Sequence, residues 1–360
     1  MKSWQESASL ILAARHVQKY NSAISPAIHN YKLLWLKRHQ KSSFMPGTYV
    51  FPGGIVESAD SNLKWREIFA ASGLKNDSFA SLVPKIAVRP EIYRSRPNEL
   101  PREISLRITA IRETFEESGI LICKHKDDHT STNWAKHVSI PKNELQTWQN
   151  KVHNDATEFL TLCEKLNCYP DLWALREWRN WLTPTIMPKR FNTVFYLACI
   201  PLIPYAEYEA TEMEDLKWET LENLFSMDIT IPPPQQYEIA RLNEFKSIDK
   251  LLDFAMERST EEALQLYLPV LIQLKDGIVQ IMPGDTMYSK EVSLSDKQLV
   301  DKSDITIHEY RMMTPIKNRI ELWNTQIKII FSDVHGKDNY VEFPMPGYSK
   351  QAHTDIKNKL

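Results

Sequence analysis

Three glutamates lie within five residues of one another in a segment with helical periodicity. Glu113, Glu116 and Glu117 stand at positions i, i+3 and i+4, so on a helix their side chains share one face. Such a group is destabilised by its own charges and by the C-terminal end of the helix dipole, near which it lies. A hard divalent cation removes this conflict, because Mg²⁺ prefers oxygen ligands such as carboxylates, waters and substrate phosphates. The alternative is a solvated acidic face on an amphipathic helix.

Two neighbouring features favour the metal site over the solvated face. Arg112 precedes Glu116 by four residues and can hold its carboxylate by an ion pair along the helix. The chain has only nine glycines, yet Gly47, Gly53 and Gly54 fall within eight residues of one another. Bare backbone of this kind can supply a carbonyl ligand or approach a phosphate closely. We therefore predict that the glycine-rich loop neighbours the glutamates.

The helix that must position these glutamates is the clearest element of the sequence. An apolar stripe at helical spacing predicts a helix from Glu103 to Ser118, and Gly119 suits the position after its C-terminus. The residues of the stripe are Ile104, Ile108, Ile111 and Phe115. The acidic face is centred opposite this stripe, so the apolar side is expected to pack and the acidic side to face outward.

Other segments predict an α/β protein. Apolar runs predict strands at 8–14, 32–37 and 191–203, and Asp276-Gly277 predicts a hairpin between 268–274 and 278–282. A polar, proline-rich stretch at about 61–102 resembles an insertion. The Trp- and Leu-rich segment at about 142–181 predicts two or three amphipathic helices as a second insertion. The P-P-P-Q run at 232–235 suggests a soft boundary between residues 1–225 and an α+β extension over 226–360.

Composition excludes several classes of protein. Apolar residues make up 42% of the 360 residues and charged residues 25%, which is the balance of a globular protein and not of a disordered or fibrous chain. A net charge of −2 makes nucleic-acid binding unlikely. The longest apolar stretch, 193–206, is shorter than the roughly 18 residues that span a bilayer, so no membrane segment is expected. The four cysteines form no CxxC pair and are interpreted as reduced thiols of an intracellular protein.

The glutamate segment resembles the signature of the Nudix hydrolases, G-x5-E-x7-R-E-U-x-E-E-x-G-U, where U is bulky and apolar. Its second half stands here as R-E-T-F-E-E-S-G-I from Arg112 to Ile120, and its first half as Gly54, five residues and then Asp60. Asp60 replaces the usual glutamate, Thr114 replaces an apolar residue, and 51 residues separate the two halves instead of 7. The two halves of the signature need only lie close together in space, and a long surface insertion between them adds little to the entropic cost of loop closure.

A box split in this way resembles the peroxisomal coenzyme A diphosphatase branch of the family. The motifs that carry the likeness are F-M-P-G-T-Y-V-F-P-G-G at 44–54, D-L-W-A-L-R-E-W at 171–178, W-L-T-P at 181–184, R-F-N-T at 190–193, P-P-P-Q at 232–235 and M-P-G-D at 282–285. The resemblance implies a Nudix α/β/α sandwich. It also implies hydrolysis of coenzyme A or acyl-CoA to adenosine 3′,5′-bisphosphate and (acyl-)4′-phosphopantetheine. Alternatives are another nucleoside diphosphate-linked substrate, such as an ADP-sugar, a dinucleotide or a capped RNA, and a module that binds acyl-CoA or a nucleotide without cleaving it.

Residue roles follow from the resemblance. The metal ligands would be Glu113, Glu116, Glu117 and Gly54, holding Mg²⁺ or alternatively Mn²⁺, and Arg112 would orient a carboxylate. The general base would be Glu116 or, from a later loop, Glu212; the latter is equally well explained as one acid of a charged surface run. Lys189 and Arg190 are candidate cations for the 3′-phosphate, although ordinary solvated charges are the more common explanation.

The tail bears on localisation. The sequence ends in Asn358-Lys359-Leu360, which is close to the S-K-L peroxisomal signal. Taken with the branch resemblance, this predicts import into peroxisomes through the import receptor, with the cytoplasm or mitochondrion as alternatives.

Overall fold

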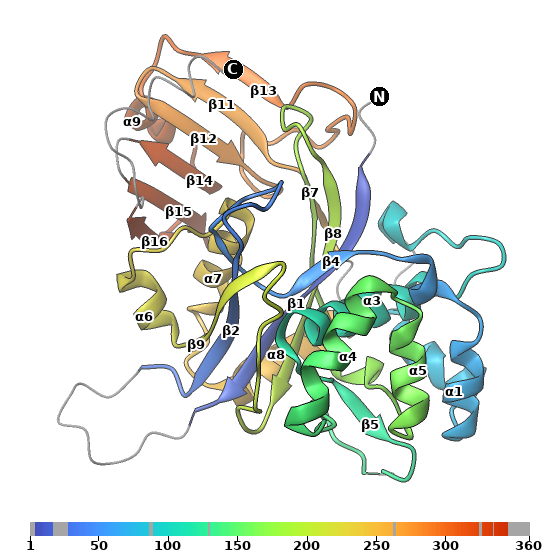
Figure 1. Cartoon of the computed structure of the whole chain (residues 1–360). Helices are drawn as coiled ribbons and strands as arrows, with labels where there is room; N and C mark the ends of the chain where they lie inside the picture. The colour runs from blue at the N-terminus through green and yellow to red at the C-terminus, as the bar shows by residue number, and fades with distance from the viewer. Residues whose placement is uncertain are drawn as a thin grey trace.

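The computed structural model describes residues 4–16, 28–85, 89–128, 130–261, 264–323, 326–333 and 335–344, and Figure 1 shows the chain with its elements labelled. A large mixed sheet lies at the centre, in the order β10-β7-β8-β1-β2-β3, with β4 paired to β1 and β9 paired to β2. Its strands are β1 (Gln5–Arg15), β2 (Tyr31–Arg38), β3 (Tyr49–Val50), β4 (Gly53–Ile55), β7 (Arg176–Leu182), β8 (Phe191–Ile200), β9 (Met213–Glu219) and β10 (Leu266–Tyr267).

Strand β1 is the axis of this sheet. It pairs in parallel with β8 along most of its length. On its other side it pairs with β2 only at Ala13–Arg15 and with β4 at Ser7–Ser9. Beside β1 the sheet therefore changes partner, from β2 at Ala13–Arg15 to β4 at Ser7–Ser9.

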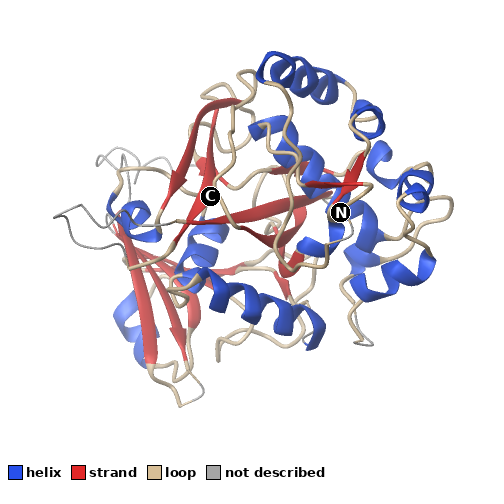
Figure 2. Cartoon of the chain, turned by 90° about the horizontal axis from the view of Figure 1, so that it is seen from below, coloured by secondary structure: helices blue, strands red, loops and turns tan. Residues whose placement is uncertain are grey.

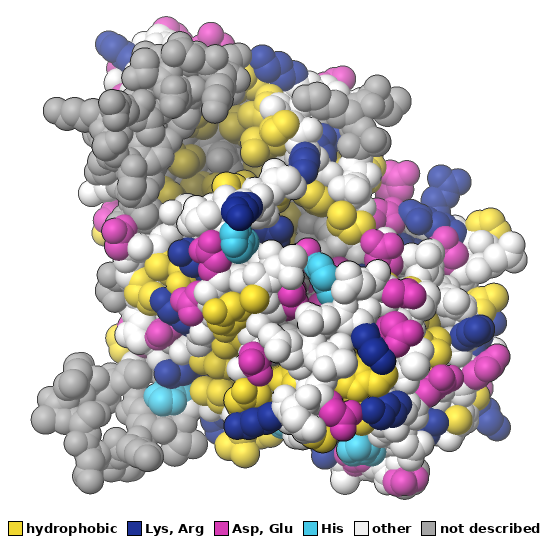
Figure 3. Space-filling view, in the orientation of Figure 1, with side chains coloured by type: hydrophobic (Ala, Val, Ile, Leu, Met, Phe, Trp, Pro, Cys, Tyr) yellow, Lys and Arg dark blue, Asp and Glu magenta, His cyan; other side chains and the backbone are white. Residues whose placement is uncertain are grey.

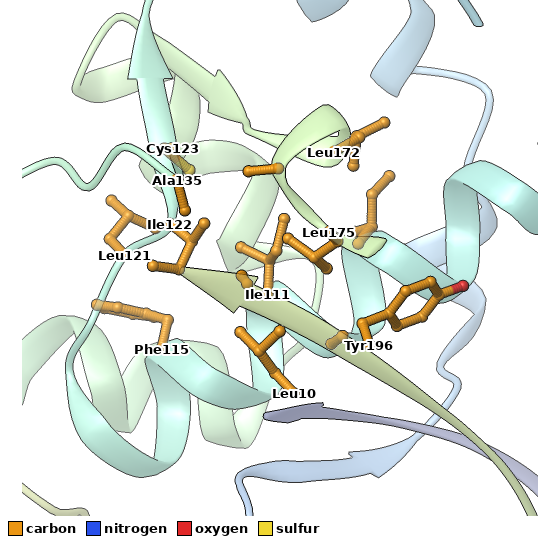
Figure 4. Close-up of a cluster of buried hydrophobic side chains, with 14 of the residues drawn as sticks. Leu10, Ile111, Phe115, Leu121, Ile122, Cys123, Ala135, Leu172, Leu175 and Tyr196 are labelled. Atoms are coloured by element: carbon orange, nitrogen blue, oxygen red, sulfur yellow. The ribbon is translucent and has the colours of Figure 1, made fainter. Parts of the chain in front are cut away.

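Helix α3 (Arg102–Ser118) packs on one face of the sheet, as predicted, and ends at Gly119, whose φ of 72° fits the left-handed conformation. Its apolar stripe joins a buried cluster with β1 and β8, part of which is drawn in Figure 4. The prediction that the acidic side of this helix faces outward is wrong. Glu116 and Glu117 are only 6% and 2% exposed, because the loop after β3, helix α4 and the loop before β9 cover that side.

Helices α7 (Pro233–Leu242) and α8 (Ile248–Glu261) cover the opposite face, completing an α/β/α sandwich. Figure 2 shows the helices lying on both sides of the strands. The carboxylate of Glu238 on α7 accepts hydrogen bonds from the indoles of Trp178 and Trp181 and pairs with Arg179, 3.1 Å away. The soft boundary near residue 226 thus falls between two parts of one sandwich, because α7 and α8 supply its second helical layer.

A second sheet follows, in the order β13-β11-β12-β14-β15-β16. Its elements are β11 (Val270–Leu274), β12 (Gly277–Ile281), β13 (Leu299–Lys302), α9 (Ile307–Met312), β14 (Asn318–Trp323), β15 (Gln326–Ser332) and β16 (Asp338–Pro344). The predicted hairpin is confirmed, since β11 and β12 pair antiparallel across Lys275-Asp276. Residues of this sheet share a buried cluster with α7 and α8.

The two predicted insertions differ in outcome. The first contains short helices: α1 (Trp65–Ala71), α2 (Asn76–Phe79) and 3₁₀ turns at Ser58–Ser61, Ala80–Leu82 and Glu91–Tyr93. The second was predicted as helical over 142–181, which is wrong for its last third. Helices α4 (Lys142–Asn154) and α5 (Glu158–Lys165) are followed by β6 (Cys168–Pro170), which pairs with β5 (Cys123–His125), by a 3₁₀ turn at Leu172–Ala174 and by strand β7. Strand β7 is buried along almost its whole length, so its Trp-rich pattern lacks the alternation typical of a half-exposed strand. Within the described residues, no helix combines the length and hydropathy needed to cross a membrane.

Candidate active site

The glutamates of α3 meet the glycine-rich loop, as predicted. The backbone N–H of Gly53 donates to Oε2 of Glu117 over 2.9 Å. Gly54 lies against Glu113 so closely that a Cβ atom there would stand 2.4 Å from the Glu113 carboxyl carbon. Gly53 has φ 154°, and its Cβ would stand 2.5 Å from the carbonyl oxygen of Ala8. Gly53 is therefore required for the close approach to β1, whereas a side chain at position 54 would displace the Glu113 carboxylate.

Asp60 and Arg112 join the two halves of the interrupted signature. Arg112 Nε lies 2.7 Å from Asp60 Oδ1, and both side chains are almost completely buried. The same guanidinium contacts Glu116 and lies 3.0 Å from Glu113 Oε1. Thr109 on α3 donates a further hydrogen bond to Asp60. Arg112 therefore fixes the position of acidic groups from both halves, and the 51 intervening residues form the excursion that contains α1 and α2.

The three glutamates have strongly perturbed acidities. Burial, together with the charges of Glu116, Asp60 and Glu212, raises the pKa of Glu113 to about 8, although Arg112 opposes the rise. Burial also raises the pKa of Glu116 to about 7 against the same opposition. For Glu117, burial and the charges of Glu113 and Glu212 raise the pKa well above its usual range. Burial and mutual repulsion therefore both disfavour the ionised forms of these three glutamates.

Glu212 faces this group from the loop before β9. Its charge contributes to the raised pKa of each helix glutamate, and its side chain lines the same cavity. Buried Glu209 shapes the loop, because its carboxylate accepts the backbone N–H groups of Thr211 and Glu212 over 3.0 Å. Glu212 is therefore held at the site and not in an unrelated charged run. Nothing in the sequence indicated the role of Glu209, which depends on a turn of the chain.

A cavity of about 790 Å³ lies at this site. The helix glutamates, Arg112, Gly54 and Glu212 line it, and its walls continue past the sheet to the C-terminal segment. Such a volume suits a ligand of the size of a cofactor or a large metabolite.

Lys189 and Arg190 differ in their placement. Lys189 lines the cavity, is exposed, and its Nζ lies 2.9 Å from Oγ of Ser43. The Arg190 side chain is buried, and its guanidinium donates to the carbonyl oxygens of Thr183 and Leu294. It is absent from the cavity lining, so the structure brings only Lys189 of this pair to the site.

His153, on α4, was missed by the sequence reasoning. It lines the cavity, and its Nδ1 lies 3.8 Å from Oε2 of Glu116. Gln149, one turn earlier, donates to the backbone carbonyl of Glu116. The pattern of this segment indicated an amphipathic helix but not which face would meet α3, so no local signal could have identified the histidine.

Two further features concern possible partners. The thiols of Cys123, Cys163 and Cys168 lie within 4.8 Å of one another in the core, and none of the four cysteines forms a disulfide. Their spacing concealed this cluster, because Cys123 comes from β5, 40 residues before Cys163.

On the face shown in Figure 3, lysine and arginine side chains are interspersed with acidic ones. This face lacks the continuous basic surface that binding of a nucleic-acid backbone requires.

Comparison with known proteins agrees with this geometry. The family model of the NUDT19 Nudix domain matches residues 4–242. The acyl-coenzyme A diphosphatase NUDT19 of Xenopus laevis is 36% identical over 85% of this chain and 87% of its own length. The Gallus gallus protein of the same name is 32% identical over 94% of each chain.

Among solved structures, a Nudix hydrolase from Alicyclobacillus acidocaldarius superposes with a TM-score of 0.50 at 16% identity, covering 74% of this chain and 99% of that one. This likeness shows the fold. With a matching family model over most of its length and relatives of this similarity, the chain belongs to the NUDT19 Nudix domain family of hydrolases.

Proposed function

We propose that this enzyme hydrolyses the pyrophosphate bond of coenzyme A and its acyl thioesters, giving adenosine 3′,5′-bisphosphate and (acyl-)4′-phosphopantetheine. The observation that carries the proposal is the set of three carboxylates of raised pKa, held against Gly53–Gly54 inside a large cavity. Relatives that match this chain over most of its length are named acyl-coenzyme A diphosphatases, which supports the choice of substrate.

The donor set fits a divalent metal ion. The glutamates offer oxygen ligands, which Mg²⁺ and Mn²⁺ prefer over nitrogen or sulfur. Burial is the main cause of their raised pKa values and repulsion between the acids adds to it, so a bound cation would favour the ionised carboxylates. We propose that Glu113, Glu116 and Glu117 hold Mg²⁺, with Mn²⁺ as an alternative, and that the neighbouring Gly54 backbone assists. When bound, the ion neutralises pyrophosphate charge and lowers the pKa of a water.

The protein groups divide the remaining work. Hydrolysis requires that a water attack one phosphorus atom in line while the P–O bond to the other phosphate breaks. A carboxylate must accept the proton of this water, and Glu116 and Glu212 are the paired candidates. Arg112 contacts the acids and orients them without reacting. Nδ1 of His153 lies 3.8 Å from the Glu116 carboxylate, too far for a hydrogen bond but close enough for an ion pair when the imidazole is protonated.

The decisive experiment is incubation of the purified protein with coenzyme A in Mg²⁺ and then in chelator, with products identified by mass. We expect the two named products in Mg²⁺ and none in chelator. Glu117→Gln should lower kcat/KM about 10³-fold with an unchanged circular dichroism spectrum. Glu67→Gln, at an exposed position of α1, is the matched control.

Each contrary outcome has a distinct meaning. If coenzyme A and its thioesters survive while an ADP-sugar or dinucleotide is cleaved, the substrate assignment is wrong. If coenzyme A binds but Glu117→Gln is as active as the wild type, the helix has no part in the reaction.

Peroxisomal localisation stays a prediction from the sequence, because Asn358, Lys359 and Leu360 lie outside the described residues. Microscopy of a fluorescent protein fused to the N-terminus, with and without the final tripeptide, would test it.

A further inference from the structure

The cavity extends to the side of the central sheet that lies away from α3. Ser7, Ala8 and Ser9 of β1 all line the cavity, and the side chains of the two serines alternate with that of Ala8. Phe195 also lines the cavity and belongs to the buried cluster under α7 and α8, whereas Ala8 belongs to the cluster under α3. The cavity therefore connects the glutamate side of the sheet with the side that the C-terminal segment covers.

We call the part of the cavity on that side of the sheet the second limb. The C-terminal segment forms one of its walls. Leu271 of β11 and Gln280 of β12 are directly paired across the hairpin, so their side chains share one face of the second sheet, and both line the cavity. The adjacent pair, Ile272 and Val279, faces the other way and packs in a cluster with Tyr310 of α9. One face of this hairpin is thus committed to the core and the other to the cavity.

The wall is uncharged throughout. After residue 226, the described lining residues are Pro232, Pro233, Pro234, Gln235, Pro269, Leu271 and Gln280, and none carries a charge. In contrast, the lining acids and the cations Arg38, Arg112 and Lys189 all come from the earlier part of the chain. The cavity is therefore polarised, with a charged end at the glutamates and an uncharged end at the second sheet.

Coenzyme A has the same polarity. Its nucleotide carries the pyrophosphate and the 3′-phosphate, whereas the pantetheine arm has two amides and no charge and ends in the thiol that bears the acyl group. Amides need polar partners spaced along an otherwise apolar wall, and Gln280 and the hydrogen-bonded Ser7–Thr193 hydroxyls supply such groups beside Leu271 and Trp181.

We infer that the limb between the central sheet and the β11–β12 hairpin binds the pantetheine arm and its acyl chain, so that the C-terminal sheet selects acylated over free coenzyme A. This inference rests on the proposed diphosphatase function. It gives residues 226–360 a part in substrate recognition beyond packing. It also places the scissile bond at the glutamates, with the nucleotide at the charged end.

The test compares kcat/KM for free coenzyme A with kcat/KM for medium-chain acyl-CoA in full-length variants. Leu271→Asp places a carboxylate on the apolar wall and should lower the acyl-CoA to coenzyme A ratio at least tenfold. Val300→Asp is the matched control, because Val300 is exposed on the neighbouring strand β13 of the same sheet and does not line the cavity. Its ratio should stay within twofold of the wild type.

A milder variant and a chain-length series guard against misfolding. Leu271→Ala should lower the same ratio at least threefold at an unchanged Tm. In the wild type, kcat/KM should rise by up to about fourfold for each additional methylene that the limb buries, and this slope should flatten in Leu271→Asp.

The outcomes distinguish a failure of the proposed function from a failure of the assignment of this limb. If the wild type cleaves neither coenzyme A nor acyl-CoA, the proposed function fails. If the wild type cleaves both and folded Leu271 variants keep its ratio and its chain-length slope, the function stands and the assignment of this limb is wrong.

Discussion

At the scale of single residues, the site is organised by contacts that cross long stretches of sequence. Glu117 is held by the Gly53 amide, Arg112 by Asp60, and Glu212 by the loop that Glu209 caps. Glu117 and Asp60 are therefore positioned by partners 64 and 52 residues away, whereas Glu212 is positioned by the local turn that Glu209 caps. This arrangement is what distinguishes a working set of carboxylates from three glutamates on a helix.

Exchange of Glu212 separates the two candidates for the general base. If Glu212 accepts the proton, Glu212→Gln should lower kcat about 10²- to 10⁴-fold while the Mg²⁺ concentration for half-maximal rate changes little, because the helix glutamates remain. Steady-state rates over a Mg²⁺ series measure both quantities. Activity within threefold of the wild type would assign the base to Glu116.

Exchange of Asp60 tests the closure of the divided signature. Asp60→Asn leaves the buried guanidinium of Arg112 without the carboxylate that its Nε contacts, and removal of one partner of a buried pair costs about 3–5 kcal/mol. Urea unfolding should show this loss in the free energy of unfolding. Asp77→Asn, at an exposed position of α2, should leave stability unchanged, and equal stability of the two variants would refute the importance of the pair.

At the scale of elements, α3 is the helix that the sequence predicts best and whose environment it predicts worst. The isoleucine stripe and Gly119 are local signals, and both the helix and its end are found as predicted. The burial of its acidic face depends on the loop carrying Gly53 and on α4, which no pattern within the helix could reveal. Periodicity alone predicted that the glutamates face solvent, and the resemblance to the Nudix signature is what identified them as a site.

Strand β7 illustrates the opposite failure. Arg176–Leu182 contains two tryptophans and two arginines, a composition that also suits an amphipathic helix. Its strand conformation depends on pairing with β8 and on the Glu238 carboxylate of α7, which satisfies both indoles and Arg179. The partners that determine this conformation lie 10 to 60 residues away, so the sequence of the segment alone could not predict it.

The raised pKa values of the α3 glutamates predict how the free energy of unfolding depends on pH and on bound metal. Folding raises the pKa of Glu113 to about 8 and of Glu116 to about 7, so the folded chain retains protons that the unfolded chain loses above its ordinary glutamate pKa. The stability of the metal-free protein should therefore fall as pH rises from about 5 to about 8. Mg²⁺ competes with these protons and should raise Tm more at about pH 8 than at about pH 5.5.

Thermal unfolding in chelator and in Mg²⁺ across this pH range measures both effects. Glu113→Gln should flatten the pH dependence, since it removes one of the titrating groups. The same pH slope in this variant and the wild type would contradict the assigned acidities.

At the scale of the whole molecule, the chain before residue 226 does not complete its own core. Strands β1, β7 and β8 bury one face against α3 and the other against α7 and α8. The proline run at 232–235 suggested a boundary from composition, but the chain crosses it and returns to the same sheet, adding β10 beside β7. The second sheet then extends the cavity wall, which links its packing to recognition.

A chain ending at residue 225 should therefore fail to fold cooperatively. Truncation would expose the apolar cluster beneath α7 and α8 and remove Glu238, leaving Arg179 as an unpaired buried charge. Urea unfolding followed by tryptophan fluorescence would show a broad transition of low amplitude, compared with one sharp transition of the full chain. A sharp transition in the truncated chain would instead establish an independent domain.

The pairing of β1 with β8 has a consequence for how the chain acquires activity. Ser7 meets Thr193 across 186 residues, Asp60 meets Arg112 across 52, and Glu238 meets Trp178 across 60. Contacts of such high contact order form late and make folding slow. During synthesis at the ribosome, the glutamates of α3 that we propose as metal ligands emerge long before the strands and helices that enclose them. Nascent chains should therefore stay inert towards the cellular coenzyme A pool until nearly the entire polypeptide has been released.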